Sequence, residues 1–225
     1  MPPAVPGRVC RPSWCSCCDG AQVWDLDTNT LLWQKALESD ELTAVAALGR
    51  KLDLPVEYID AEGQYHVTQS DLDRLLAGRL GEYHRGVLCR RAVPLTVLPE
   101  ALAPLGIVKV NLPVVPLELY PALTCALAQA GVQGMECGTG SFEVTSPQAG
   151  KQAAVAFAAK RLGLDLKAVM ALGDSGNDAA LLRAAGWGVA MGNAPAAVQQ
   201  AADAVAPANT QGGAAWAIRR WLLTE

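Results

Sequence analysis

A short run of polar residues after an apolar segment is the part of the sequence best suited to chemistry. The apolar segment Val169–Leu172 is followed by a glycine and then by Asp174, Asn177 and Asp178. Carboxylate and amide oxygens are hard ligands of the kind that Mg²⁺ prefers. The helix that we expect to begin at Asn177 adds backbone N–H groups, which favour an anion. The run therefore predicts a divalent metal beside a phosphate.

A purely structural interpretation of the same run is also open. Asp174 and Asp178 flank the start of the expected helix, and aspartate is a common N-cap residue. The position of the run favours the chemical interpretation, because ligands of open α/β sheets bind just beyond the carboxyl ends of the strands.

The elements that would position these residues alternate between helix and apolar strand. The strands are continuous apolar runs and do not alternate with polar residues, which indicates a parallel sheet covered on both faces. The predicted helices are 151–162, 177–185, 195–202 and 213–223, and the predicted strands are 169–172, 187–191 and 204–206.

The preceding part of the chain mixes helices and strands without a regular βαβ order, which indicates an α+β arrangement. Residues 1–19 contain four prolines and four cysteines, and we expect them to be a disordered or aberrant leader. We expect strands at 21–24, 31–33, 55–59, 64–67, 107–112, 133–137 and 141–145, and helices at 39–52, 70–80 and 117–130.

The polar run and the residues after it resemble a known family. Gly173-Asp-Ser-Gly-Asn-Asp178, Ala185-Gly-Trp-Gly-Val-Ala-Met-Gly-Asn-Ala194 and Ala202-Asp203 closely resemble the C-terminal signature of the haloacid dehalogenase superfamily, and of its Cof-type phosphatases in particular. Lys151 is similar in position to the family's lysine after the cap domain, and Asp19-Gly20-Ala21 resembles the Asn-Gly-Ala that opens the cap.

The resemblance implies an α/β fold, with a Rossmann-like parallel-sheet core into which a mixed α/β cap domain is inserted. It assigns residues 20–144 to the cap and residues 145–225 to the C-terminal part of the core.

The function that the resemblance implies is a Mg²⁺-dependent phosphatase acting on small phosphorylated metabolites, such as sugar phosphates, through an aspartyl-phosphate. Asp174 would then be a ligand of Mg²⁺, and Asp178 a second acidic group at the metal or its waters. Asn177 and Asn193 would bind the substrate. Lys151 would be both substrate-binding and catalytic, because it would balance charge between the nucleophile and the phosphoryl group.

The family's N-terminal nucleophile motif, Asp-x-Asp-Gly-Thr, has no convincing match. The stretch that begins at Asp25 and Asp27 is similar, but Thr28 and Asn29 stand in place of Gly and Thr. We interpret it as an acidic turn between two strands and expect an N-terminally incomplete enzyme. A non-catalytic remnant and a phosphomutase with the same chemistry are the alternatives.

The composition of the chain argues against several other classes of function. The chain has 225 residues, 51% of them hydrophobic, and a net charge of −4. This charge argues against nucleic-acid binding, which needs clustered Lys and Arg.

We find no secretory signal and no apolar run of the roughly 18 residues that a membrane helix needs, so we expect a cytoplasmic protein. The sequence does not indicate the oligomeric state. The cluster of Cys10, Cys15, Cys17 and Cys18 lacks the paired spacing of a zinc site.

Overall fold

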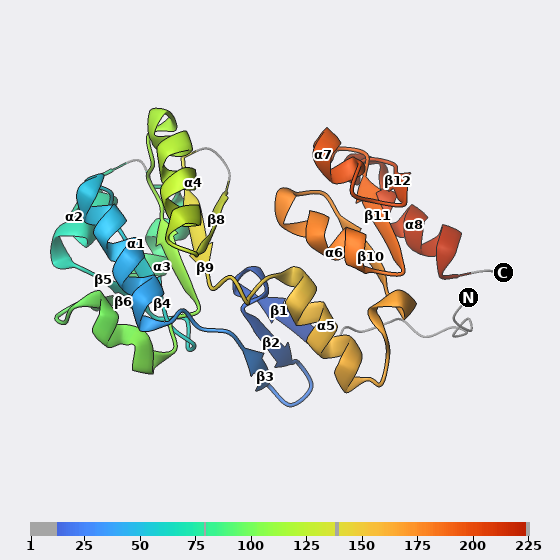
Figure 1. The fold of residues 1–225 in the computed structure, drawn as a ribbon, viewed down its shortest axis with the longest axis horizontal. Helices are drawn as coiled ribbons and strands as arrows, with labels where there is room; N and C mark the ends of the chain where they lie inside the picture. The colour runs from blue at the N-terminus through green and yellow to red at the C-terminus, as the bar shows by residue number, and fades with distance from the viewer. Residues whose placement is uncertain (1–12, 79, 138–139, 224–225) are drawn as a thin grey trace. The chain divides into compact units, whose positions relative to one another are not determined.

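The computed structural model describes residues 13–78, 80–137 and 140–223 of the chain (Figure 1). The described residues form two compact units. Unit 1 comprises those of Met1–Trp33 and Gly150–Glu225, and unit 2 comprises those of Gln34–Ala149. Each unit has a hydrophobic core of its own, and the chain crosses from one unit to the other twice.

The C-terminal part of unit 1 is built around a parallel sheet, as the apolar strands predict. The strands lie in the order β10-β11-β12, and both pairs are parallel. Helices α6 and α7 pack on one face of the sheet, and α8 packs on the other. The elements are η4 (Leu166–Ala168), β10 (Met170–Gly173), η5 (Gly176–Asp178), α6 (Ala179–Ala184), β11 (Trp187–Met191), α7 (Ala196–Gln199), β12 (Ala204–Ala206), η6 (Asn209–Gln211) and α8 (Gly213–Trp221), where η marks a 3₁₀ helix.

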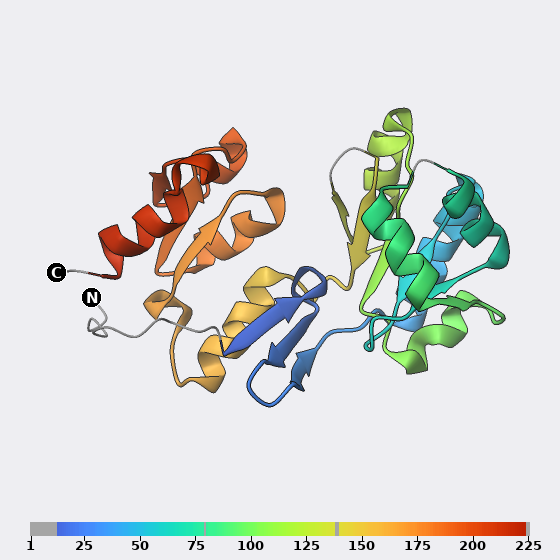
Figure 2. The ribbon, with the colours of Figure 1, turned by 180° about the vertical axis from the view of Figure 1, so that it is seen from behind.

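A second sheet of unit 1 lies where the sequence predicts a leader and the start of a cap. The strands β1 (Trp14–Cys17), β2 (Gln22–Asp25) and β3 (Thr30–Gln34) are neighbours in that order, and η1 (Cys18–Gly20) joins the first two. Helix α5 (Lys151–Arg161) lies beside this sheet in both views (Figures 1 and 2).

The structure therefore differs from two expectations drawn from the sequence. Residues 13–19 of the expected leader are ordered into a strand and a turn, while residues 1–12 lie outside the described part. Residues 20–33 pack with residues 150–225 and not with the rest of the segment 20–144 that was assigned to the cap. The predicted hairpin over 21–33 is confirmed, because β2 and β3 are adjacent.

Contacts between residues distant in sequence explain why this sheet belongs to unit 1. The carbonyl oxygen of Gly20 accepts a hydrogen bond from the amide of Gly150 at 3.3 Å. The backbone of Gly20 has a φ of +87°, and a Cβ there would lie 2.1 Å from the carbonyl carbon of Gly150. Further along, the ring of Trp33 stacks on Phe157 with 5.9 Å between centroids. Local sequence patterns carry no signal for such contacts.

Unit 2 contains a six-stranded sheet in the order β6-β5-β4-β7-β9-β8. The pair β5 and β6 is parallel, and the other pairs are antiparallel. Apolar side chains of α1 and α4 pack with those of the central strands in one core, and α2 and α3 form a smaller cluster with β5. The elements are α1 (Ser39–Lys51), β4 (Glu57–Ile59), β5 (Tyr65–Val67), α2 (Gln69–Ala77), α3 (Glu82–Arg91), β6 (Ala92–Pro94), η2 (Pro99–Leu105), β7 (Lys109–Leu112), η3 (Leu117–Leu119), α4 (Tyr120–Gln129), β8 (Gln133–Glu136) and β9 (Phe142–Thr145).

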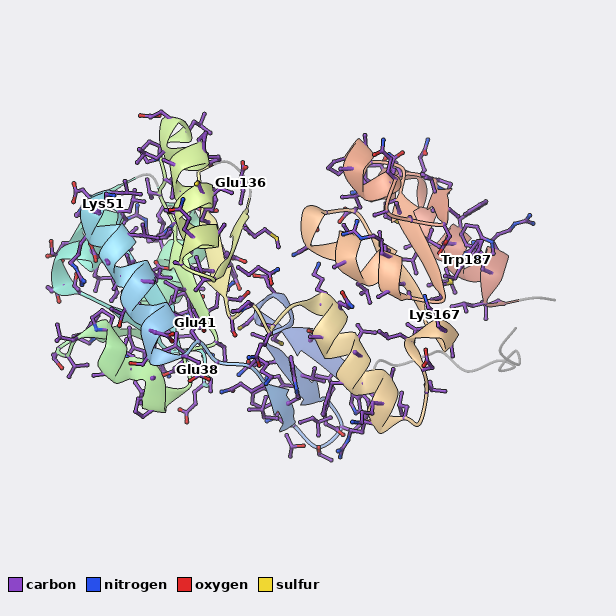
Figure 3. All side chains as sticks on the ribbon, in the orientation of Figure 1. Glu38, Glu41, Lys51, Glu136, Lys167 and Trp187 are labelled. Carbon is purple, nitrogen blue, oxygen red and sulfur yellow. The ribbon has the colours of Figure 1, made fainter. Side chains whose placement is uncertain are left out.

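Helix α1 shows how local sequence sets an element of unit 2. At its start the side chain of Glu41 accepts a hydrogen bond from the amide of Glu38 at 2.9 Å, which completes a capping box. Lys51 lies in the last turn, where a cation suits the negative end of the helix dipole (Figure 3). None of the helices in the described part of the chain is long and apolar enough to span a membrane.

The cysteine cluster forms no disulfide among the residues that can be described. The Sγ atoms of Cys15 and Cys17 lie 3.7 Å apart and are not joined by a disulfide, and Cys10 lies outside the described part. Burial raises the pKa of the Cys17 thiol to about 11, and the neighbouring Cys15 adds to this effect. The thiol is therefore protonated at neutral pH.

The first prediction concerns the contact between the two glycines. We expect Gly20→Ala to lower the free energy of unfolding by about 2 kcal/mol or more, because the new Cβ meets backbone atoms and the residue has a positive φ. Urea unfolding followed by circular dichroism measures this loss. Gly81→Ala is the control, since a Cβ there has no neighbour within 4 Å. Equal stabilities of the two variants would contradict the close packing.

Candidate functional site

Strand β10 delivers the polar run to one edge of the parallel sheet. The strand ends at Gly173, and the 3₁₀ turn η5 follows at once. A Cβ at Gly173 would lie 2.3 Å from the Cβ of Asp178, so the glycine makes room for that aspartate. Asp178 is 5% exposed, whereas Asp174 is exposed to solvent.

The carboxylate of Asp178 closes the turn that carries the run. Its Oδ2 accepts hydrogen bonds from the amides of Asp174 at 2.9 Å and Ser175 at 3.0 Å, and from the Ser175 hydroxyl at 3.0 Å. The amide of Asp178 in turn donates to the carbonyl oxygen of Ser175 at 3.0 Å. Asp178 is thus the third residue of a capping box at the start of η5, whereas its side chain makes no capping hydrogen bond as the N-cap of α6.

Lys151 brings helix α5 to the same turn. Its Nζ donates to Asp178 Oδ1 at 2.6 Å and to Asn177 Oδ1 at 2.9 Å. Lys151 is the first residue of α5 and follows Gly150, whose amide binds Gly20. The hydrogen bond between Gly150 and Gly20 and the hydrogen bonds of Lys151 thus both hold the N-terminal end of α5.

The pKa of Asp178 is set by opposing effects. Burial alone raises the pKa, because a carboxylate loses hydration there. The pKa is lowered by the hydrogen bond and the charge of Lys151 and by the amides of Ser175 and Asp174. Together these effects outweigh that of burial. The pKa therefore lies below its ordinary value, and Asp178 is ionised at neutral pH.

The loop after β11 supplies a further predicted residue. Asn193 Nδ2 donates to Asp174 Oδ2 at 3.2 Å, and Asn193 Oδ1 accepts from the amide of Asn209 at 2.9 Å. The structure therefore brings all five predicted site residues into one hydrogen-bonded network: Lys151, Asp174, Asn177, Asp178 and Asn193.

Asp19 belongs to this network and was missed as a site residue. It lies in η1 with a φ of +53°, and its Oδ1 accepts a hydrogen bond from Asn177 Nδ2 at 3.3 Å. The resemblance of Asp19-Gly20-Ala21 to a family motif was the available signal. No pattern in the sequence indicates that this residue lies beside Asn177, which is distant along the chain.

Asp25 lies at the other end of the β1–β2 pair. Trp14 pairs with Asp25, whereas η1, which holds Asp19, connects the opposite ends of the two strands. Asp25 Oδ1 accepts hydrogen bonds from the amides of Asp27 and Thr28, both at 2.9 Å. The bond from the Thr28 amide is the main reason that the pKa of Asp25 lies below its ordinary value. These contacts are those of an acidic turn.

Three further residues of the signature, Gly186, Gly188 and Asp203, have packing roles. Asp203 Oδ2 accepts from the amide of Gly188 at 2.8 Å, which fixes the start of β12 against β11. A Cβ at Gly188 would lie 2.3 Å from the carbonyl oxygen of Leu182, and one at Gly186 would lie 1.8 Å from that of Lys167. Only glycine permits these approaches.

A cavity of about 380 Å³ lies beside the network within unit 1. Its polar walls are formed by Ser16, Asp19, Lys151 and Asp178, and apolar walls by Val155 and Leu172. The wall thus places one lysine ammonium beside the carboxylates of Asp19 and Asp178.

How a metal could bind depends on which carboxylate oxygens of the network do not already accept hydrogen bonds. Both oxygens of Asp178 already accept hydrogen bonds, while Asp174 is exposed and has Oδ2 bonded to Asn193. Within the described ranges, no group of three or more His, Cys, Asp or Glu side chains could hold a metal ion. Mg²⁺ keeps several waters and commonly binds one or two carboxylates together with a substrate phosphate. Asp174 fits this partial set, and the metal role of Asp178 stays a prediction.

Comparison with known proteins connects this network with a family. A model of haloacid dehalogenase-like hydrolases matches residues 118–218, which include the whole polar run. The C-terminal part of the chain is thus similar to haloacid dehalogenase-like hydrolases. The resemblance found in the sequence is thereby confirmed.

Relatives and solved structures extend the comparison. The 5-amino-6-(5-phospho-D-ribitylamino)uracil phosphatase YcsE of Bacillus subtilis is 45% identical over 83 residues, which are 37% of this chain and 33% of that protein. YxeH of the same organism is 27% identical over 221 residues, covering 92% of this chain and 75% of that protein. The structure of the HAD subclass IIB sugar phosphatase BT4131 has a TM-score of 0.68 at 23% identity, covering 90% of this chain and 73% of that chain. This likeness confirms the predicted α/β fold.

A second prediction follows from the pKa of Asp178. A pKa that is lowered by folding stabilises the protein above the ordinary carboxyl value of 3.8. This stability is lost as the pH falls through the lower folded value, because protonation then favours the unfolded chain. We expect the urea midpoint of the wild type to fall more steeply with acid than that of Asp178→Asn. Glu118→Gln, which changes an exposed carboxylate, should retain the wild-type dependence.

Proposed function

We propose that the chain is a Mg²⁺-dependent phosphatase of small phosphorylated metabolites, such as sugar phosphates. The observation that carries the proposal is the Lys151 ammonium, held by Asn177 and Asp178 at the carboxyl end of β10. An ammonium group has three N–H donors, and these two contacts use two of them. The third donor is left for an oxygen of the phosphate.

The other members of the network would orient the substrate and the metal. Asp174 would hold Mg²⁺, and the metal would supply a positive charge that neutralises the phosphoryl oxygens. Asn193 donates to Asp174 and so fixes the direction of that carboxylate. Asp178 would hold Lys151 in place, because its buried carboxylate forms an ion pair of 2.6 Å with the ammonium group. Asp19 orients the amide of Asn177 so that the amide oxygen faces Lys151.

The route that the family resemblance implies has two steps. An aspartate oxygen attacks phosphorus while the bond to the metabolite oxygen breaks, and the released alkoxide takes up a proton. Water then attacks the aspartyl-phosphate, which returns the carboxylate and releases inorganic phosphate. We assign the attacking aspartate to none of the described residues: Asp25 serves a turn, and Asp19 binds Asn177.

The names of two similar proteins support the substrate class. YcsE is named for a substrate that carries phosphate on a ribityl chain, and BT4131 is titled a sugar phosphatase. Both names describe a phosphate ester of a sugar or polyol. The match covers only part of YcsE, so its own substrate is not carried over to this chain.

A third prediction tests the metal site by turnover. Any hydrolysis of an aryl phosphate by the purified chain should require Mg²⁺, and Asp174→Asn should lower its rate by about two orders of magnitude, because charge stabilisation at the phosphate is lost. Asp25→Asn is the matched control, and we expect the wild-type rate from it. The release of aryl alcohol measures both rates.

Other outcomes of this assay point to the alternative functions. A wild-type chain without turnover at any Mg²⁺ concentration would favour a non-catalytic remnant. Loss of activity in Asp25→Asn would identify Asp25 as the nucleophile and contradict the turn interpretation. Phosphate that appears on an added sugar, with none released as inorganic phosphate, would indicate a phosphomutase.

A fourth prediction tests phosphate binding without turnover. Inorganic phosphate should raise the thermal midpoint of the wild type, because a ligand that binds only the folded state stabilises it. We expect this rise to vanish in Lys151→Met, with each variant compared with its own phosphate-free midpoint. Lys160→Met lies on the same helix, is exposed, and should keep the full rise. The same rise in Lys151→Met would contradict the assignment of Lys151.

A further inference from the structure

Unit 2 carries a row of polar side chains across one face of its sheet. Glu57 on β4 pairs with Asn111 on β7, and Asn111 pairs with Glu143 on β9. Successive side chains of a strand point to opposite faces. The neighbouring register row, which includes Tyr58 and Val110, lies in the hydrophobic core, so the polar row faces away from that core. Packing in the hydrophobic core of unit 2 therefore does not explain this row of polar side chains.

A fully buried carboxylate organises the row. Glu57 is 0% exposed, and both of its oxygens lie 3.0 Å from Nε2 of His84, which comes from α3. Asn111 Nδ2 donates to Glu57 Oε2 at 3.1 Å. Removing a carboxylate from water is costly unless partners compensate it, and here two side chains from different elements do so.

The carboxylate also fixes the orientation of Asn111. A carboxylate only accepts hydrogen bonds, so Asn111 must turn its NH₂ group towards Glu57. Its carbonyl oxygen, Oδ1, then remains as an acceptor. The residue is 7% exposed, and Oδ1 is buried with no hydrogen-bond partner among the residues that the structure describes. Buried polar atoms are rarely left in this state, which makes the atom a candidate for a ligand contact.

Asn111 lines a cavity of about 250 Å³ that lies entirely within unit 2. Aromatic rings, an ion pair and an imidazole form much of its wall. The ion pair joins Lys109 Nζ to a Glu143 oxygen at 2.9 Å. The residues that matter here are Tyr65, Tyr83, His84, Lys109, Asn111 and Glu143.

The chemistry of the wall favours a neutral ligand. Lys109 is paired with Glu143, and the Glu57 carboxylate is held by His84 and Asn111, so a charged ligand would have to disturb these contacts. Tyrosine rings offer apolar surface for C–H groups, and the polar side chains offer hydrogen bonds to hydroxyl groups. The volume suits one molecule of about the size of a hexose.

We propose that this cavity binds a neutral polyhydroxylated compound, a sugar or a polyol, with one ligand hydroxyl donating to Asn111 Oδ1. Glu57 is a positioning residue in this site, because it holds Asn111 and His84. The proposal does not depend on the proposed phosphatase function, since its residues all belong to unit 2 and its test requires neither metal nor turnover.

The test is saturation-transfer NMR on the full chain, with D-glucose and ribitol as probes at millimolar concentration and without metal. We expect transfer from the protein to at least one of the two. Tyr83→Ala and Asn111→Leu should each weaken its binding about tenfold or more. Tyr83 is 85% exposed, so its replacement leaves the core intact even if Asn111→Leu fails to fold.

Leu98→Ala is the control, since Leu98 is exposed in the same unit and lies outside the cavity wall. It should bind as the wild type does. The proposal is overturned if neither probe receives saturation, or if the folded variants at Tyr83 and Asn111 bind like the control.

Discussion

The ion pair between Lys151 and Asp178 is the interaction on which the structure of unit 1 depends most. It joins the start of α5 to the turn after β10, and through Asn177 it reaches η1 and the sheet of β1 to β3. Asp178 is buried, so the loss of its partner would leave an uncompensated charge inside the protein, at a cost of roughly 3–5 kcal/mol. The same pair places an ammonium group at the predicted ligand site, and stability and function are therefore linked at this point.

Glycines make this pairing possible by letting segments approach closely. Gly173 leaves space for Asp178, and Gly20 leaves space for the backbone at Gly150. Both set how close a functional side chain can come, so the positions of Asp178 and Lys151 depend on residues without side chains.

Much of the candidate site could be predicted from the sequence because it is local. The run from Asp174 to Asp178 lies in a single turn, and the apolar strand before it has a clear pattern. Strand β1, which contains Trp14, and the packing of its sheet on α5 could not be predicted, because α5 is far along the chain. Helix α3 was missed because its ten residues include three arginines and a glycine and show almost no apolar periodicity. Asp19 was missed for the same reason as the sheet: its partner is a residue of another segment.

The division of the chain into two units also separates its aromatic residues. All six tryptophans lie in unit 1, and all four tyrosines lie in unit 2. Tryptophan can be excited at wavelengths where tyrosine does not absorb, and tyrosine emits at shorter wavelengths than tryptophan. Native fluorescence can therefore follow each unit separately without an attached dye. Two emission bands that change at different denaturant concentrations would show that the units unfold independently and do not form one cooperative block.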